Sequence, residues 1–220
     1  MHRLTLAGIG SALALSTVAA VRLGGWAVVT VENPPDYLIA GKATELTFTV
    51  RQHGMTLLSD LRPSIEASSR GRRVTGKAWP LQQKGGYRGT ITVPDTGSWQ
   101  LTIHSGFGRS KAMLLPIAAV GAAQGRMSIA EPERGRRLFA AKGCVSCHVH
   151  GGVDVAGEVQ QAPDLTNRRF PADYLAKFLA NPAIKTPTMP NLRMPNLGLR
   201  QAEIASLVAF INSEKKVARR

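Results

Sequence analysis

The hydrophobic pattern of the chain changes its period once, and this change most constrains the fold. Before residue 121, apolar and polar residues alternate with a period of two, as at 46–50 and 99–103, which indicates strands with one buried face. After residue 130, apolar residues recur at helical spacing. The sequence therefore predicts two domains, an all-β domain over 21–120 and an all-α domain over 131–217, joined by a linker of small and polar residues over 121–130.

Short runs rich in β-forming residues follow one another through the first domain. Turn residues separate them, for example at Asn33-Pro34-Pro35 and Gly85-Gly86. About seven short strands at this spacing predict an immunoglobulin-like antiparallel sandwich. The expected strands are 27–31, 45–50, 64–67, 74–79, 87–93, 98–103 and 112–117.

Three helices are expected in the second domain. The first is predicted over 131–141, because Pro132 suits a first helical turn and Glu131 and Glu133 complement the helix dipole. The second follows Pro171 and stops at Asn181-Pro182. The third is expected over 201–215. The region between the last two helices is a proline-rich loop that contains two methionines.

The amino terminus has the profile of an export signal. A short basic start precedes an apolar stretch over 4–21, and small residues at 18–20 suit cleavage after Ala20. We expect a signal peptide over 1–20. The alternative is an uncleaved membrane anchor, because the apolar stretch has about the minimum length of a span. In both cases the rest of the chain is expected in the periplasm or on the outer face of the cytoplasmic membrane.

The formal net charge of +14 is spread over both predicted domains. The sequence contains no nucleic-acid-binding motif to accompany this charge, so nucleic acid is not an expected partner. One interpretation is a field that docks redox partners with acidic surfaces, which include a membrane respiratory complex. The plain alternative is a solvated surface.

The motif Cys144-Val145-Ser146-Cys147-His148 contains the only two cysteines of the chain. Two thiols three residues apart can add to the two vinyl groups of one porphyrin, and the adjacent histidine is then directed at the iron. A thioredoxin-like pair is disfavoured because no alternating strand and helix pattern surrounds the motif, and a zinc site lacks further ligands. The sequence predicts one covalently attached haem c with His148 as an iron ligand.

The region around this motif resembles the class I cytochromes c over about the last 90 residues. The resemblance implies a cytochrome c fold, in which the Pro163 carbonyl accepts a hydrogen bond from His148 and Leu165 packs on the porphyrin. The segments that carry it are Gly135-x-x-Leu138-Phe139, Lys142-Gly143-Cys144, Ala162-Pro163-Asp164-Leu165, Met194-Pro195 and the stretch from Glu203 to Phe210.

Met194 is favoured as the second iron ligand, because it stands at the short distance before the last helix that the resemblance implies. Met189, in a local copy of the same Met-Pro-Asn sequence, is the alternative. His150 is a third candidate, but it lies too close to His148 to reach the other side of a porphyrin and is interpreted as a solvated loop histidine. Arg168 and Arg169 are predicted either to pair with the haem propionates or to be surface charges.

Two stretches of the first domain loosely resemble the YtkA/FixH-like exported β-sandwich domains, at 51–55 with 60–63 and at 103–107. Their side chains include His53, Met55 and His104, soft ligands that suit copper. No cysteine lies in this domain, so a blue-copper centre is excluded. A copper site built from these three residues is one interpretation, and histidines without a metal are the default.

The leading functional hypothesis is an exported electron carrier whose β domain docks it to a respiratory or redox partner. A site with both axial positions filled by His and Met favours electron transfer over catalysis. One alternative is a haem subunit of a larger oxidoreductase, and another is a redox or copper-handling sensor. No nucleophile and base pair, phosphate loop or nucleotide fingerprint is present in the sequence, so the chain alone is not expected to be an enzyme.

Overall fold

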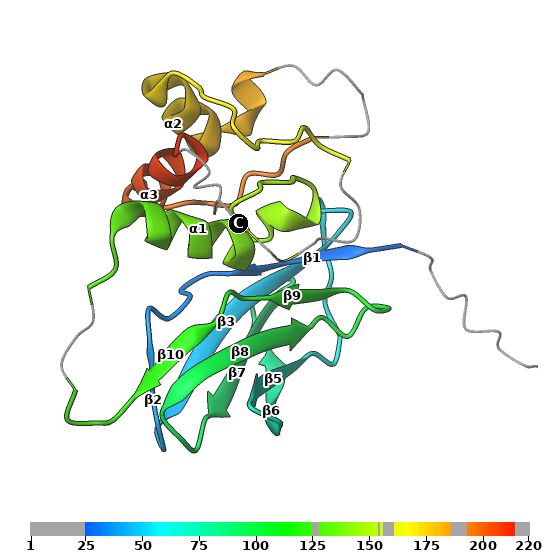
Figure 1. The fold of residues 1–220 in the computed structure, drawn as a ribbon. Coiled ribbons are helices and arrows are strands. Elements are labelled where there is room, and N and C mark those ends of the chain that lie inside the picture. The colour runs from blue at the N-terminus through cyan, green and yellow to red at the C-terminus, as the bar shows by residue number, and fades with distance from the viewer. Residues whose placement is uncertain (1–24, 125–127, 154, 156–160, 186–192, 214–220) are drawn as a thin grey trace, which may run out of the picture.

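The computed structural model describes residues 25–124, 128–153, 155, 161–185 and 193–213. It contains a sheet-rich region followed by a helical region, called here the β domain (25–120) and the helical domain (128–213) (Figure 1). The predicted two-part layout is thus observed. The predicted signal peptide over 1–20 lies outside the described residues. No helix within the described ranges has the length and apolar character needed to cross a membrane.

The strands of the β domain form one continuous sheet, which differs from the predicted immunoglobulin-like sandwich. The order of its neighbouring strands is β1-β3-β7-β6-β5-β8-β10-β2, with β4 paired to β3 and β9 to β8, and the sheet curves into a half-barrel (Figure 1). A sandwich would need two separate sheets. The strands are β1 (Ala27–Val31), β2 (Leu38–Ile39), β3 (Ala43–Gln52), β4 (Thr56–Leu57), β5 (Ser64–Ser69), β6 (Arg72–Pro80), β7 (Gly86–Thr92), β8 (Gly97–His104), β9 (Lys111–Met113) and β10 (Ile117–Val120).

One long strand, β6, makes the sheet continuous. Its first part, Arg72 to Lys77, pairs with β5, and its last part, Ala78 to Pro80, pairs with β7. The strand therefore leads from one side of the curved sheet to the other. Sequence alternation reports which face of a strand is buried, and it does not report which neighbours the strand pairs with.

The last predicted strand, over 112–117, is wrong in its extent. The structure divides this region into β9, which pairs with β8 near His104, and β10, which pairs with β8 near Trp99 and also with β2. Pro116 lies between the two strands and cannot donate a backbone hydrogen bond to a ladder. The two-residue strands β2 and β4 were not expected, because such short runs carry no readable period.

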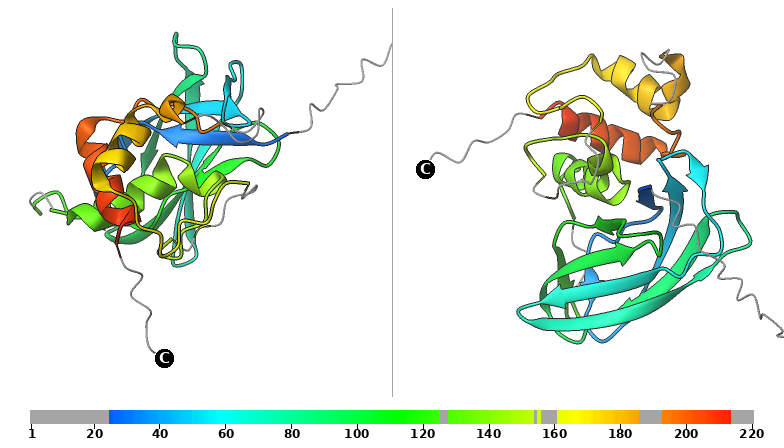
Figure 2. Two further views of the ribbon diagram at one scale, coloured as in Figure 1. Left: turned by 90° about the horizontal axis from the view of Figure 1, so that it is seen from above. Right: turned by 90° about the vertical axis from the view of Figure 1, so that its right-hand side faces the viewer.

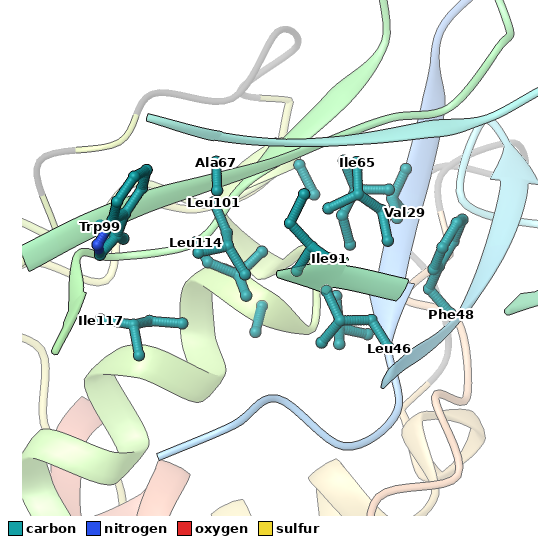
Figure 3. Packing of buried hydrophobic residues seen from close by; sticks show 14 of the residues in the cluster. Val29, Leu46, Phe48, Ile65, Ala67, Ile91, Trp99, Leu101, Leu114 and Ile117 are labelled. Atoms are coloured by element: carbon teal, nitrogen blue, oxygen red, sulfur yellow. The ribbon is translucent and has the colours of Figure 1, made fainter. Parts of the chain in front are cut away.

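The core of the β domain lies inside the curve of the sheet (Figure 3). Side chains from strands far apart in sequence meet there, and many are fully buried. All five residues of β1 are buried, because one face of this strand packs on the core and the other lies towards the helical domain. Labelled members of this core are Val29, Leu46, Phe48, Ile65, Ala67, Ile91, Trp99, Leu101, Leu114 and Ile117.

The helical domain contains three α-helices in its described residues: α1 (Glu131–Ala141), α2 (Ala172–Ala180) and α3 (Gln201–Ile211). They confirm the predicted helices, although α3 ends at Ile211 and residues 214–215 of the prediction lie outside the described range. Two short 3₁₀ turns, η1 (Cys144–Ser146) and η2 (Pro182–Ile184), follow α1 and α2. Viewed from the side, α1 lies on the β domain, α3 lies over α1, and α2 is farthest from the sheet (Figure 2).

Helices α1 and α3 cross at Gly135. A Cβ atom at this position would lie 1.9 Å from the Ser206 carbonyl oxygen and 2.6 Å from Phe210 Cβ. Only glycine permits the two helix backbones to approach this closely. This crossing sets the frame in which the haem-attachment motif and the segment before α3 face one another.

Polar contacts fasten the helical domain to the chain between β1 and β2. Arg134 of α1 forms an ion pair with Asp36 at 3.1 Å, and Arg137 donates to the Asp36 carbonyl at 2.9 Å. Ala141, at the end of α1, belongs to the β-domain core. The two domains therefore share an interface that combines packing with directed hydrogen bonds.

Candidate functional site

The motif predicted to attach haem lies on one tight turn directly after α1. Backbone amides of Cys147 and His148 both donate to the Cys144 carbonyl, at 3.1 and 2.8 Å. This turn closes the 3₁₀ segment η1 and places both thiols and His148 within one short stretch. Such proximity of two sulfurs and an imidazole is what attachment of one porphyrin requires.

Gly143 positions this turn against the β domain. Its φ of 79° lies in the left-handed region, and a Cβ atom there would approach Val28 Cγ1 to 2.5 Å and the Val29 carbonyl oxygen to 2.9 Å. Both the backbone conformation and the close packing on β1 therefore require glycine. The β domain thus packs directly against the motif through β1.

Both cysteines are half-buried free thiols. Burial, together with the neighbouring Cys147, raises the pKa of the Cys144 thiol to about 12. Burial also raises the pKa of Cys147. Addition of each S–H group across a vinyl double bond would give the two thioethers of a c-type haem.

His148 makes the hydrogen bond that the resemblance to cytochromes c implied. Its Nδ1 lies 2.9 Å from the Pro163 carbonyl oxygen. A carbonyl oxygen only accepts, so Nδ1 carries the proton and Nε2 keeps its lone pair. Burial lowers the pKa of His148, and the hydrogen bond to Pro163 opposes this effect only in part. The imidazole is therefore neutral, as a metal ligand must be.

Apolar side chains from three separate segments line the surroundings of the motif. Leu165 and Met194 are half-buried and pack against the same hydrophobic cluster as Cys144. The buried members of this cluster are Leu138, Phe139, Leu175, Leu179, Ile204, Leu207, Phe210 and Ile211. The predicted alternative ligand, Met189, lies outside the described residues.

These residues fit a covalently held haem in their chemistry. The chain offers two free thiols, a neutral imidazole with its Nε2 unprotonated, and a thioether, and both Cys144 and Met194 pack against one apolar cluster. Thiols, imidazole and thioether are the donor set of c-type haem sites.

Arg168 and Arg169 are exposed and follow Leu165 on a turn of the chain. The Arg168 backbone amide donates to the Leu165 carbonyl at 3.1 Å. Both arginines therefore lie on the same loop as Pro163. Their predicted contact with haem propionates stays a prediction.

His150 is not the solvated loop histidine that we expected. It is only 4% exposed, and its ring packs on Phe210 at 4.2 Å and near Phe139 at 5.9 Å between centroids. Its Nδ1 accepts a hydrogen bond from the Gly152 amide. Local sequence does not reveal this burial, because Phe210 comes from a helix sixty residues away and a histidine in a glycine-rich loop is usually exposed.

A buried ion pair beside the motif was also missed by sequence reasoning. Lys142 Nζ lies 2.9 Å from Glu203 Oε1 and donates to the Glu32 carbonyl at 2.7 Å, and the side chains of Lys142 and Glu203 are 4% and 6% exposed. Burial raises the pKa of Glu203, but hydrogen bonds from Lys142 and Arg200 outweigh it, so the net shift is downward. Lys142, which follows α1 and precedes Gly143, is thus bonded both to α3 through Glu203 and to the β domain through Glu32.

The three residues considered for copper are spread over the β domain. His53 packs its ring on Trp26, with centroids 5.6 Å apart, and Met55 is exposed. His104 lies 4.0 Å from Glu66 on β5. Among the described residues, no group of three or more His, Cys, Asp or Glu side chains is placed to hold a metal ion. A copper site using these residues stays a prediction that no contact of the structure supports.

The helical domain matches a known protein family. The family described as cytochrome c oxidase, cbb3-type, subunit III, has a model that matches residues 130–211. This region coincides with α1, the attachment motif, Met194 and α3. It supports the assignment of the helical part as a cytochrome c domain, which implies haem c and transfer of electrons. No curated protein matches the chain.

Three solved structures are similar to part of the chain at low levels. A putative glycoside hydrolase from Bacteroides vulgatus is 14% identical, with a TM-score of 0.31, over 41% of this chain and 17% of its own. The superoxide reductase (neelaredoxin) from Ignicoccus hospitalis is 14% identical, with a TM-score of 0.30, over 42% of this chain and 80% of its own. A CARDB domain from Pyrococcus furiosus, in complex with di-metal ions, is 12% identical, with a TM-score of 0.25, over 43% and 87%. At these TM-scores the likenesses carry no conclusion about function.

Proposed function

We propose that this chain is an exported electron carrier that holds one haem c covalently through Cys144 and Cys147. The observation that carries the proposal is the tight turn that brings the two free thiols and His148 together, with His148 Nδ1 held by the Pro163 carbonyl at 2.9 Å. When bound, haem supplies reversible one-electron chemistry. The residues of the chain attach it, orient it and surround it with apolar side chains.

His148 and Met194 are the proposed iron ligands. The hydrogen bond to Pro163 fixes the tautomer of His148 and makes its Nε2 a stronger donor. The thioether of Met194 is neutral and soft, so it favours the reduced form and raises the reduction potential relative to two nitrogen ligands. If His148 and Met194 both bound the iron, no ligand position would remain for a substrate, which favours electron transfer over catalysis.

The β domain is proposed to dock the carrier to a redox partner with an acidic surface, at the outer face of the cytoplasmic membrane or in the periplasm. The net charge of +14 supports this, because opposite charge steers association. A second candidate is a haem subunit of a larger oxidoreductase, and the name of the matched family, an oxidase subunit, favours it. Purification from native membranes under mild conditions separates the two, since a subunit stays with its complex at high salt and a docked carrier dissociates.

The ligand assignment is tested by replacing each methionine in the haem-loaded protein. Met194→Ala should abolish the weak sulfur-to-iron absorption band at the red edge of the visible spectrum and lower the reduction potential. Met189→Ala serves as the matched control and should keep the band. Survival of the band in Met194→Ala with its loss in Met189→Ala would assign the iron to Met189 instead. Absence of covalent haem in the wild-type protein, made in a host that attaches haem c, would remove the proposed function itself.

A further inference from the structure

The β domain contacts both sides of the proposed haem site. On the attachment side, Trp26 lines a small cavity of about 40 Å³ together with Gly143, Val145 and Ser146. Near the segment that carries Met194, the side chains of Pro195 and Trp26 both lie close to Gly54. Pro195 Cγ lies 3.9 Å, and Trp26 Cη2 4.0 Å, from the place that a Cβ atom would take at Gly54. Trp26 therefore borders a cavity shared with the turn that carries the thiols, and it also lies near Gly54, close to which Pro195 of the Met194 segment is found.

The part of the β domain near Pro195 is a tight turn at the end of β3 that leads into β4. It comprises residues 51–55 and is called here the 51–55 turn. Its backbone amides at Gly54 and Met55 donate to the carbonyls of Arg51 and Gln52 at 3.3 and 3.0 Å. The His53 amide donates to the Trp26 carbonyl at 3.0 Å, and the His53 ring packs on the indole. These bonds tie the turn and Trp26 into one preorganised unit on the edge of the sheet.

The Met194 segment depends on its neighbours for its position. Residues 193–200 form neither helix nor strand, and both Met194 and Pro195 are half-buried. On one side, Met194 packs on the helical cluster. On the other side, the segment, orange in Figure 2, runs to the cyan end of β3 and β4, where Pro195 meets Gly54. A segment without its own hydrogen-bonded ladder keeps one conformation only when packing holds it from both sides.

The contact between the domains is fixed by further bonds. The buried pair of Lys142 and Glu203, with the bond from Lys142 to the Glu32 carbonyl, lies on the same side of the interface as the motif. Arg134 and Arg137 bind Asp36 at its other end. These bonds hold the β domain against the helical domain. They therefore also fix where the 51–55 turn lies relative to Pro195.

We infer that Trp26 and the 51–55 turn are positioning residues that hold the Met194–Pro195 segment in its place beside the attachment turn, and so would stabilise a bond from haem iron to the Met194 sulfur. The inference rests on the proposed function. It assigns to the β domain a role inside the redox site, in addition to any role in docking. The His53 ring, considered above for copper, then holds the turn against Trp26.

The inference is tested on the full haem-loaded chain by adding free imidazole, which competes with the methionine for ferric iron. Trp26→Ala should tighten imidazole binding by about tenfold, since each 1.4 kcal/mol lost from the bond between iron and methionine gives a factor of ten. The same variant should weaken the sulfur-to-iron absorption band and lower the reduction potential. Trp79→Ala is the matched control, because Trp79 is 54% exposed on β6, away from the site, and it should change none of the three readings.

A second variant covers the case in which Trp26→Ala does not fold. Pro195→Ala removes the ring from the other side of the contact and should tighten imidazole binding in the same direction. Where both single variants fold, the double variant should show less than the sum of their effects, because both residues pack around the same point of the 51–55 turn, at Gly54. Unchanged imidazole affinity in a folded, haem-loaded variant of either residue would overturn the inference. Loss of haem or of the band in the wild-type protein would instead refute the proposed function.

Discussion

The two domains bury their hydrophobic residues in different ways. The β domain closes on a core of its own, in which Leu46, Phe48 and Leu101 are fully buried among side chains from the same sheet. The helical domain has a smaller buried cluster, and the residues next to its reactive groups, such as Leu165 and Met194, are only half-buried. The comparison indicates that the β domain is stable through its own packing, whereas on the proposed function the helical domain would be completed by the haem that its thiols attach.

The largest expected effect comes from removing both thiols with the double variant Cys144→Ala, Cys147→Ala. Covalent haem should be lost completely, which a haem stain of the denatured protein detects. The helical circular dichroism signal should then unfold at a much lower denaturant concentration. Trp26 borders the helical domain, so the measurement uses a Trp26→Phe background, in which the remaining Trp79 and Trp99 lie on β6 and β8 and report the β domain. If the fluorescence transition shifts as far as the helical one, the two domains are one cooperative unit and the comparison fails.

The next largest effect is expected from Phe48→Ala in the core of the β domain. Phe48 is fully buried and stacks near Tyr87 at 5.8 Å between ring centroids. Truncation of such a ring destabilises a domain by about 3–5 kcal/mol. Tryptophan fluorescence during denaturant unfolding should show this loss while the absorption spectrum of bound haem stays unchanged. Thr90→Ala, at an exposed position of β7, should change the free energy of unfolding by less than about 0.5 kcal/mol.

A smaller loss is expected from Gly135→Ala at the crossing of α1 and α3. The added methyl group overlaps the Ser206 carbonyl, and such overpacking destabilises by about 1–3 kcal/mol, although alanine favours the helix itself. The loss should be seen in the helical circular dichroism signal and in the haem spectrum. Gly121→Ala is the control, since a Cβ atom there meets nothing within 4 Å and its φ is not in the left-handed region. Equal effects of both variants would contradict the close helix crossing.

The smallest expected effect is a pH dependence located at the buried pair of Lys142 and Glu203. The pKa of Glu203 lies below its ordinary value of 4.5 in the folded protein, because the hydrogen bonds from Lys142 and Arg200 outweigh burial. Its contribution to stability is therefore complete above the ordinary value and is lost as pH falls through the lowered pKa. Glu203→Gln should flatten this acid limb in the free energy of unfolding of the helical domain. An unchanged acid limb would mean that other carboxyl groups cause it.

Local signals in the sequence were sufficient for the three helices and for most of the strands, although not for β2, β4 or the division between β9 and β10. Pro132 and the acidic first turn located α1, and the alternation around Leu46 and Trp99 located β3 and β8. The attachment motif is local too, since its thiols and histidine lie within five residues. Each of these features depends on neighbours in the chain, and so the residue order carries it.

Contacts between distant segments could not be obtained in this way. The half-barrel depends on the two partners of β6, and the burial of His150 depends on Phe210, sixty residues away. The placement of Trp26 beside Pro195 depends on the docking of two domains.

The sequence alone predicted a haem-attachment motif and determined that it lies in a helical domain that follows a β domain, because spacing and period are properties of the residue order. Only the tertiary structure decided that the β domain packs against the motif at Gly143 and comes close to the Met194 segment at Gly54. The reason is physical: hydrophobic periodicity shows that a face is buried, and packing of the complete chain decides what buries it.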